Sequence, residues 1–268
     1  MLKQTLIIFF FVVVFLVCPF KSWADTKPDR SQSHYWISNT FGVGINPPVL
    51  GDIFKFYKKI PLDFGENYLF SDSNLRGGLI NTISPKFDKP GLMFGFSPML
   101  ILDLELAYQP ILYWTTYEFH SYKDKYDDAA RSHITPHYKT CQYFLASTQL
   151  RMKAGQVVMV DMFDAEYWSG TGYWFSDEIG TILSQGPAFH NKTFLLWEFQ
   201  PEMRWFVDYE LHHYTPSGYR KQIIGMGVYA DKIFGHTGFF LEAGYHLENP
   251  DYHGIMILLG VLSEWRLK

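Results

Sequence analysis

Apolar and polar residues alternate along most of this chain. Between Thr193 and Leu211 the odd positions are almost all apolar, whereas the even positions from Phe194 to His212 are mostly charged or polar. The same period of two occurs between Leu92 and Tyr108, from Ile111 to Phe119 and from Phe239 to Glu248. A period of two is the pattern of a β-strand with one apolar face. The sequence therefore predicts an all-β protein.

Further strands are predicted at 35–45, 77–85, 138–153, 156–168, 171–183, 219–233 and 254–267, with short fragments at 53–57 and 67–70. A two-residue hairpin is predicted at Gln109-Pro110, because the apolar parity flips there. Parity is unbroken across Pro201, which predicts a bulge or a local break within one long strand. An up-and-down barrel whose two ends lie on one side needs an even number of strands. Twelve strands are therefore expected, with ten as the alternative.

The connections between these strands are of two kinds. With the C-terminus placed in the periplasm, the connections near 250, 216, 170 and 129 fall outside the cell. Those near 235, 188, 154 and 110 fall on the periplasmic side. The longest polar loop is then outside and the tightest turns are inside, an asymmetry that is typical of transmembrane β-barrels.

The length and the ends of the apolar stripes indicate which face meets water. About ten residues span a bilayer at a tilt of about 45°, and the stripes here are that long or longer. Tyr and Trp, which favour the headgroup level, lie near the stripe ends: Tyr108, Tyr113, Tyr117, Tyr209, Tyr245 and Trp265. An apolar face turned outward to lipid is therefore predicted. The alternative is a soluble periplasmic barrel or sandwich that binds a ligand.

The N-terminus has the pattern of a secretory signal peptide. Lys3 precedes an apolar run from Thr5 to Phe20, and Ser22-Trp23-Ala24 places small residues at the −3 and −1 positions of a cleavage site. A cleaved signal is predicted at 1–24, followed by one barrel at 25–268, with a permanent membrane anchor as the alternative. The exported chain then has 21 basic and 27 acidic residues, which argues against a nucleic-acid partner. Its one cysteine, Cys141, cannot form an internal disulfide.

The signal peptide, the alternating segments and the loop asymmetry together resemble a bacterial outer-membrane β-barrel protein. The resemblance covers most of residues 35–268 and is one of architecture, without the signature of a particular porin or enzyme family. It implies a location in the outer membrane of a Gram-negative-type bacterium, contact with outer-membrane lipid, and insertion by the outer-membrane assembly machinery. The family's C-terminal signature is present as alternation (Val261, Trp265, Leu267), but the chain ends Arg266-Leu267-Lys268, without the usual final aromatic residue.

The barrel orientation assigns side chains to two faces. The predicted lumen-lining residues are Asp103, Glu105, Glu118, Arg151, Glu198, Gln200, Glu202, Arg204, Asp208, Glu210, Glu242, His246, Glu264 and Arg266. The predicted lipid-facing residues are Leu100, Leu102, Leu104, Leu106, Leu195, Trp197, Phe199, Trp205, Leu241, Leu259 and Val261. A lumen with more acid than base predicts a narrow, cation-leaning path, and hence a passive conduit or binding barrel for a small solute of unknown identity. The alternative is a plugged lumen in which Arg204 and Arg266 neutralise carboxylates.

Two other functions remain open at the level of sequence. An outer-membrane lipid-modifying acyl hydrolase would need a nucleophile beside a base, and the candidates are His212, His213 and Ser217, or Ser132 with His133. No run typical of barrel phospholipases or deacylases is present. A structural or surface-interaction barrel would act through its outer loops, chiefly 122–137.

Chemistry that depends on a cofactor has little support in the sequence. His133 and His137 are spaced i,i+4 with Asp127 and Asp128 nearby, which is one spacing for a metal site. Pro136 lies between the two histidines and the segment has the composition of a loop. No catalytic residue, metal ligand or cofactor is therefore predicted.

Overall fold

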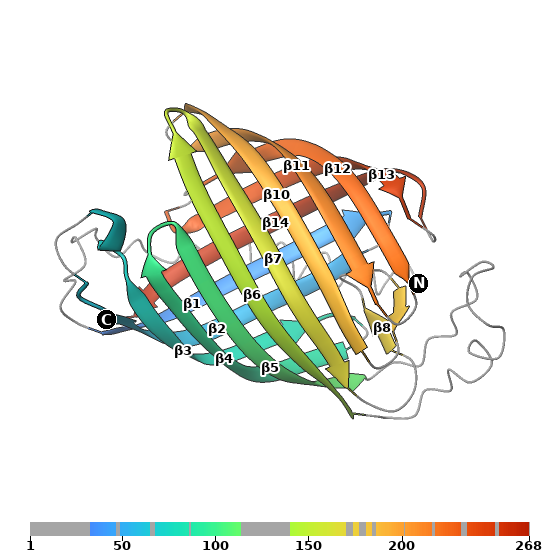
Figure 1. The fold of residues 1–268 in the computed structure, drawn as a ribbon, viewed down its shortest axis with the longest axis horizontal. Helices are drawn as coiled ribbons and strands as arrows, with labels where there is room; N and C mark the ends of the chain where they lie inside the picture. Colours follow the sequence, from blue (N-terminus) through green and yellow to red (C-terminus); the bar gives the residue numbers. More distant parts are fainter. Residues whose placement is uncertain are drawn as a thin grey trace, which may run out of the picture.

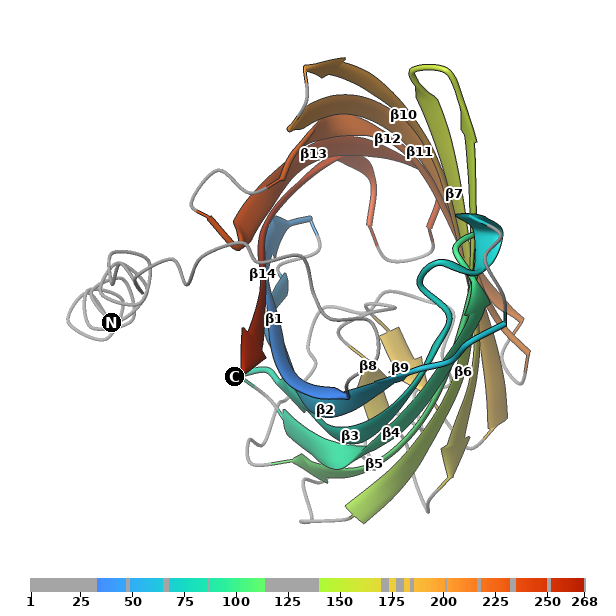
Figure 2. The same cartoon turned by 90° about the vertical axis from the view of Figure 1, so that its left-hand side faces the viewer.

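The barrel predicted from the alternation is present. The computed structural model describes residues 33–46, 49–64, 68–85, 87–113, 140–169, 174–176, 181–183, 186–200, 202–215, 218–231, 235–249 and 252–267. Among these residues, twelve strands form one closed antiparallel barrel. The strands run steeply tilted around the wall (Figure 1), and β14 lies beside β1 where the ring closes (Figure 2). The all-β fold and the count of twelve wall strands are confirmed.

The wall consists of β1 (His34–Ile45), β2 (Val49–Pro61), β3 (Asn74–Ile83), β4 (Phe87–Met99), β5 (Leu102–Tyr113), β6 (Thr140–Ala154), β7 (Val157–Ser169), β10 (Gly186–Gln200), β11 (Met203–Tyr214), β12 (Tyr219–Ala230), β13 (Thr237–Glu248) and β14 (Gly254–Leu267). Each wall strand pairs with the next one along the chain. A 3-10 helix, η1 (Tyr68–Phe70), follows β2, and a small separate sheet of β8 (Trp174–Ser176) and β9 (Thr181–Leu183) follows β7. In the described part of the chain, no helix is both long enough and apolar enough to cross a bilayer.

The two ends of the barrel differ in their connections. Tyr35 pairs with Leu267, so the start of β1 and the end of β14 lie at the same end of the barrel, which we call the terminal end. The opposite end, which we call the loop end, carries the connections at 46–48, 84–86, 114–139, 170–185, 215–218 and 249–253. The connections predicted near 250, 216, 170 and 129 therefore do share one end of the barrel. Those predicted near 235 and 154 are at the terminal end, as expected.

Several predicted boundaries are wrong. Gln109 and Pro110 lie inside β5, and the real hairpin is at 100–101. The separate periplasmic connection predicted near 188 is absent, because the loop-end connection 170–185 leads directly into β10, which runs unbroken from Gly186 to Gln200. The stretch from Thr193 to His213, expected as one strand, is divided between β10 and β11 by a connection at 201–202.

The predicted strand at 171–183 is also wrong. The described part of that segment forms the small β8–β9 sheet, which is separate from the barrel wall. The fragment at 67–70 contains a 3-10 helix instead of a strand, and the fragment at 53–57 is part of the full-length strand β2. The predicted signal peptide at 1–24 lies outside the described residues.

Two adjacent glycines in β3 provide a test of how tightly the wall is packed. A Cβ on Gly78 would lie 2.1 Å from the carbonyl oxygen of Phe56 and 2.5 Å from the Cα of Tyr57. For Gly77, on the opposite face, no described atom lies within 4 Å of such a Cβ. Only a residue without a side chain fits at position 78 without moving the backbone of the neighbouring strand.

We expect Gly78→Ala to lower the free energy of unfolding by about 1–3 kcal/mol, the usual cost of overpacking. Gly77→Ala is the matched control and should leave it almost unchanged. Urea titration of the folded barrel in lipid vesicles, followed by tryptophan fluorescence, measures both variants. Equal unfolding midpoints for the two variants would contradict the close approach of β2 to β3.

Candidate functional site: the inner wall of the barrel

The register of the strands fixes which side chains face inward. Paired residues lie on the same face of a sheet, and Trp197 pairs with Trp205 just as Leu241 pairs with Leu259. These four side chains are 42–58% exposed. The intervening residues, such as Asp208 and Glu242, face the interior and are at most 4% exposed. The outer face is thus apolar and the inner face polar, the reverse of a soluble barrel.

The interior near the loop end contains a tightly packed aromatic cluster. Its members come from seven of the described strands and are Phe87, Ile111, Cys141, Tyr143, Trp168, Ala188, Tyr214 and Tyr219. Trp168 is fully buried, and its ring packs edge-on against Tyr143 with 4.8 Å between the ring centroids. The Lys89 ammonium lies 4.4 Å from the centroid of the Tyr143 ring, a cation–π distance. We call the eight residues named above, without Lys89, the aromatic cluster.

A network of buried charges lies next to the aromatic cluster, on β7 and β10–β13. Lys192 is at its centre, with its Nζ 3.3 Å from Asp208, 3.1 Å from Glu210 and 3.0 Å from Glu242. The Nζ of Lys221 lies 3.7 Å from Glu210. Asp164, His190 and His212 complete the network. We call these residues the charge cluster; ion pairing is what makes such burial tolerable, since an isolated charge in the interior is very costly.

Closer to the terminal end, the ion pairs on the inner face are more exposed. Lys55 of β2 pairs with Glu105 of β5 at 2.6 Å, and Arg76 of β3 pairs with Asp103 of β5. Glu198 accepts from Arg204. Because β2 and β5 are not neighbours in the sheet, the Lys55–Glu105 pair reaches across the curved interior.

Two polar groups occur on the outer face, where the sequence predicts apolar residues. Asp161 of β7 accepts hydrogen bonds from Thr193 Oγ1 at 2.6 Å and from Asn191 Nδ2 at 3.1 Å, and all three side chains point outward. On β1 and β2, Asn39 donates to Asp52 at 2.5 Å. Mutual hydrogen bonding reduces the cost of placing these groups on an apolar surface.

Most of the predicted lumen-lining residues belong either to the charge cluster or to the more exposed inner face near the terminal end. Asp208, Glu210 and Glu242 are in the charge cluster. Asp103, Glu105, Glu198, Arg204 and Glu264 are on the inner face nearer the terminal end, where Glu264 accepts from the Tyr57 hydroxyl. Arg266 follows on the same face of β14.

The other predicted lumen residues lie apart from these groups. His246 Nε2 bonds to the Asn46 carbonyl oxygen at the loop end, at 2.8 Å. Arg151 is exposed at the terminal end of β6 and donates to Gln149. Gln200 and Glu202 are exposed beside the 201–202 connection. Glu118 lies outside the described residues.

The predicted lipid-facing residues lie on the outer face of their strands, with one exception: Leu100, which lies in the 100–101 connection. Leu106, Leu195 and Phe199 are exposed, while Leu102, Leu104 and Val261 are intermediate. Contact of these side chains with lipid stays a prediction.

The excess of acid predicted for the whole lumen is corrected by the structure. Bases that were not assigned to a face from sequence point inward beside the carboxylates: Lys55, Arg76, Lys89, Lys153, Lys192 and Lys221. Three of these lie on strands β2–β4, where the alternation was too weak to assign a face. Asp164 and His190 were also missed, because only the register between β7 and β10 shows that they face each other on the inner side of the wall.

The candidate catalytic residues are not brought together. His212 faces the interior and is buried, whereas the next residue, His213, faces outward and is exposed. Ser217, Ser132, His133, His137, Asp127 and Asp128 lie outside the described residues. The described part of the chain therefore offers no pairing of the two histidines with each other.

A closed antiparallel wall with an apolar outer face and an ionic inner face is the architecture of barrels that reside in outer membranes. The chain therefore has the fold of an outer-membrane β-barrel. No protein-family model matches its sequence, and no curated protein matches it. Solved structures of outer-membrane barrels are similar to it, with sequence identities of 7–10% and TM-scores of 0.41–0.45 for three of them.

Three of these structures illustrate the likeness. CdiB from Acinetobacter baumannii is 7% identical with a TM-score of 0.45, over 87% of this barrel's chain and 60% of its own. The chain thus spans only about 60% of that protein. The COG4313 outer membrane channel from Pseudomonas putida F1 is 7% identical with a TM-score of 0.44, over 90% of this chain and 100% of the channel's own chain. Omp33 from Acinetobacter baumannii is 10% identical with a TM-score of 0.41, over 89% of this chain and 100% of its own chain.

Proposed function

We propose that this outer-membrane barrel is a narrow conduit for small polar solutes, restricted at its loop end by the aromatic cluster. The observation that carries the proposal is the exposure of the ion pairs near the terminal end. The side chains of Lys55 and Glu105 are 26% and 15% exposed, and those of Arg76 and Asp103 are 17% and 19% exposed. Charged groups inside a membrane protein require partners or water. The partial exposure of these pairs supports a water-filled inner space that opens toward the terminal end.

The restriction is proposed from the packing nearer the loop end. The aromatic cluster draws on seven of the described strands, and its Trp168 and Ile111 have no exposed surface. Eight-stranded barrels are filled by their own side chains and barrels of sixteen or more strands leave a wide channel. A barrel of intermediate size, packed on one side at one end, fits the passage of small solutes only.

The ionic preference of the conduit follows from the distribution of charge. Near the terminal end carboxylates and bases are paired, so that region should discriminate only weakly between cations and anions. The charge cluster has more carboxylates than ammonium groups when its histidines are neutral. Since rings of acidic side chains favour cations, a modest preference for small cations is expected.

The acyl-hydrolase alternative finds no comparable support among the described residues, because His212 and His213 face opposite sides of the wall. A barrel that acts only through its outer loops would leave the lumen sealed. Ion conductance across a planar bilayer distinguishes that barrel from a conduit.

The test is ion conductance in planar bilayers, using the refolded barrel in potassium chloride. Discrete current steps are expected, with a reversal potential in a salt gradient that shows a modest preference for potassium. The same preparation, denatured by heat before addition, is the control for contaminating channels. A bilayer that stays sealed although the barrel has inserted in its folded form would overturn the proposal.

A further inference from the structure

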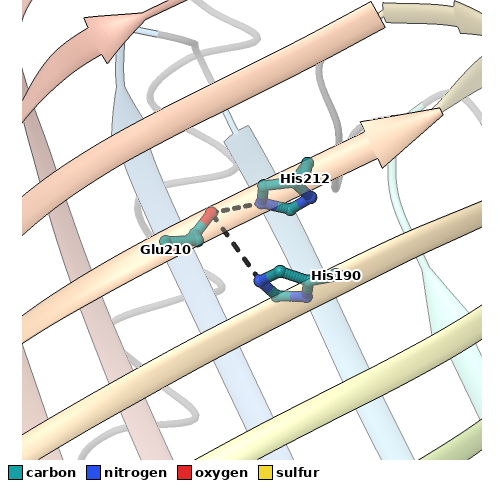
Figure 3. A group of neighbouring side chains, drawn as sticks. All are labelled: His190, Glu210 and His212. Carbon is teal, nitrogen blue, oxygen red and sulfur yellow. Dashed lines mark hydrogen bonds and ion pairs between the residues drawn. The ribbon is translucent and has the colours of Figure 1, made fainter. Parts of the chain in front are cut away.

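Two histidines and a glutamate converge inside the barrel, within the charge cluster. His190 of β10 pairs directly with His212 of β11, and Glu210 lies two residues before His212 on the same inward face. One ligand atom from each of the three residues lies within 4.8 Å of the other two. Figure 3 shows a ring nitrogen of each histidine directed at the same carboxylate oxygen of Glu210. We propose that this triad, His190–Glu210–His212, binds a divalent transition-metal ion of the zinc type.

The ligand set matches the chemistry of zinc. Two imidazoles and one carboxylate form a common three-ligand zinc set, which leaves a fourth position open for water or a solute. Around a tetrahedral zinc ion, neighbouring ligand atoms lie about 3.3 Å apart. His190 Nε2 is 3.9 Å from Glu210 Oε1, so only a small movement is needed to bring these two atoms to that spacing. Imidazole ligands favour zinc, copper and nickel over magnesium and calcium.

The hydrogen bonding of His190 supports the same assignment. Its Nε2 is buried and has no hydrogen-bond partner among the described residues. Its Nδ1 lies 3.6 Å from a carboxylate oxygen of Asp164. A carboxylate beside the far nitrogen is the usual way in which a metal-bound histidine is oriented. The free Nε2 is thus the atom that faces Glu210, as a ligand should.

The surroundings of Glu210 complete an outer shell. Lys192 Nζ lies 3.1 Å from one carboxylate oxygen, Oε2, and Lys221 Nζ lies 3.7 Å from the other, Oε1. Oε1 also contacts His212 Nε2 directly, so a bound ion would take the place of this contact. His212 is 3% exposed, so the site is shielded, while the His190 side chain retains 24% exposure and gives access from the lumen.

The balance of charge favours a cation as well. Among the described residues linked by ion pairs to the triad, four carboxylates (Asp164, Asp208, Glu210 and Glu242) face two ammonium groups (Lys192 and Lys221). With neutral imidazoles the group has a net charge of −2, and an uncompensated buried charge is strongly unfavourable. One divalent cation brings this charge to zero.

The experiment is zinc binding to the full-length folded barrel without an affinity tag. The protein is refolded in detergent, stripped with a chelator and titrated with zinc chloride in an isothermal titration calorimeter. One ion per barrel is expected. Asp164→Asn, which keeps the shape of the site, should weaken zinc binding by about 10- to 100-fold, and His190→Ala should weaken it further. His213→Ala, at the exposed neighbouring position, is the matched control and should bind as the unaltered chain does.

The absorption spectrum of bound cobalt provides a second measurement, which is independent of the calorimetric titration. Substitution with Co²⁺ should give the visible bands of a tetrahedral site, and these bands should vanish in His190→Ala. Migration on a gel with and without heating shows whether each variant is folded. Absence of zinc binding by the folded barrel, or binding that is unchanged in both His190→Ala and Asp164→Asn, would overturn the proposal. Neither readout measures conductance, so the metal site and the proposed conduit are tested separately.

Discussion

Leu241→Arg should lower the free energy of unfolding in a bilayer by about 2–4 kcal/mol, the cost of an arginine on the lipid face near the midplane. Leu241 lies near the middle of β13, faces outward and is 47% exposed. It pairs with Leu259, so the arginine would be placed against an apolar neighbour. In hydrocarbon the guanidinium loses water without gaining a partner, whereas on a water-exposed face the same change would be nearly neutral.

The matched control for this prediction is Leu247→Arg. Leu247 is on the same face of the same strand, one residue before its loop-end terminus, and is 56% exposed. Near the membrane interface the cost should fall to about 0–1 kcal/mol. Urea unfolding in lipid vesicles measures both variants. If the two variants unfold at the same urea concentration, the outer face does not meet hydrocarbon at the depth of Leu241.

Much of the wall could be predicted because alternation is a local signal. The connection after Ala154 was located correctly, since Ala154 pairs with Val157 and the inward parity changes from odd to even across the turn. Such a change is visible in the sequence without any knowledge of tertiary structure. The even strand count then followed from the requirement that the barrel close.

The two missed hairpins have one physical cause. In β4–β5 the register shifts between Phe96 and Met99, and in β10–β11 it shifts between Glu198 and Gln200. Each shift adds one residue beside a two-residue turn, as a β-bulge does. The added residue cancels the change of parity, so the same parity faces outward on both strands. The bulge expected at Pro201 was thus close to the real one, but it accompanies a turn instead of interrupting a single strand.

The false hairpin at Gln109-Pro110 arose from an apolar residue on the inner face. Ile111 follows Gln109 on the inward side of β5 and is fully buried in the aromatic cluster. Alternation assigns every apolar residue to the outer face, so a lumen that contains its own apolar packing produces an apparent change of parity. The prediction of the site was limited as well. The pairing of Lys55 with Glu105 and of Asp164 with His190 depends on strand register, which the sequence does not specify.

Trp168→Ala should raise the single-channel conductance of the barrel several-fold. Trp168 is among the largest fully buried side chains of the described residues and packs against Tyr143 in the aromatic cluster near the loop end. Its Nε1 also donates to Glu166 at 3.0 Å, which holds the ring in place. Removing the ring opens space where the proposed path is narrowest, and the conductance of a pore depends most strongly on its narrowest section.

Two variants separate a restriction in the lumen from general damage to the wall. Trp168→Phe keeps most of the volume and should conduct almost as the unaltered barrel does. Tyr167→Ala removes an aromatic ring from the adjacent, outward-facing position and should not change the conductance. Truncating a buried tryptophan costs about 3–5 kcal/mol, so each variant is first shown to be folded by its migration on an unheated gel. If folded Trp168→Ala conducts no better than Trp168→Phe, the aromatic cluster does not restrict the path, because the largest side chain in it would then have no influence on flow.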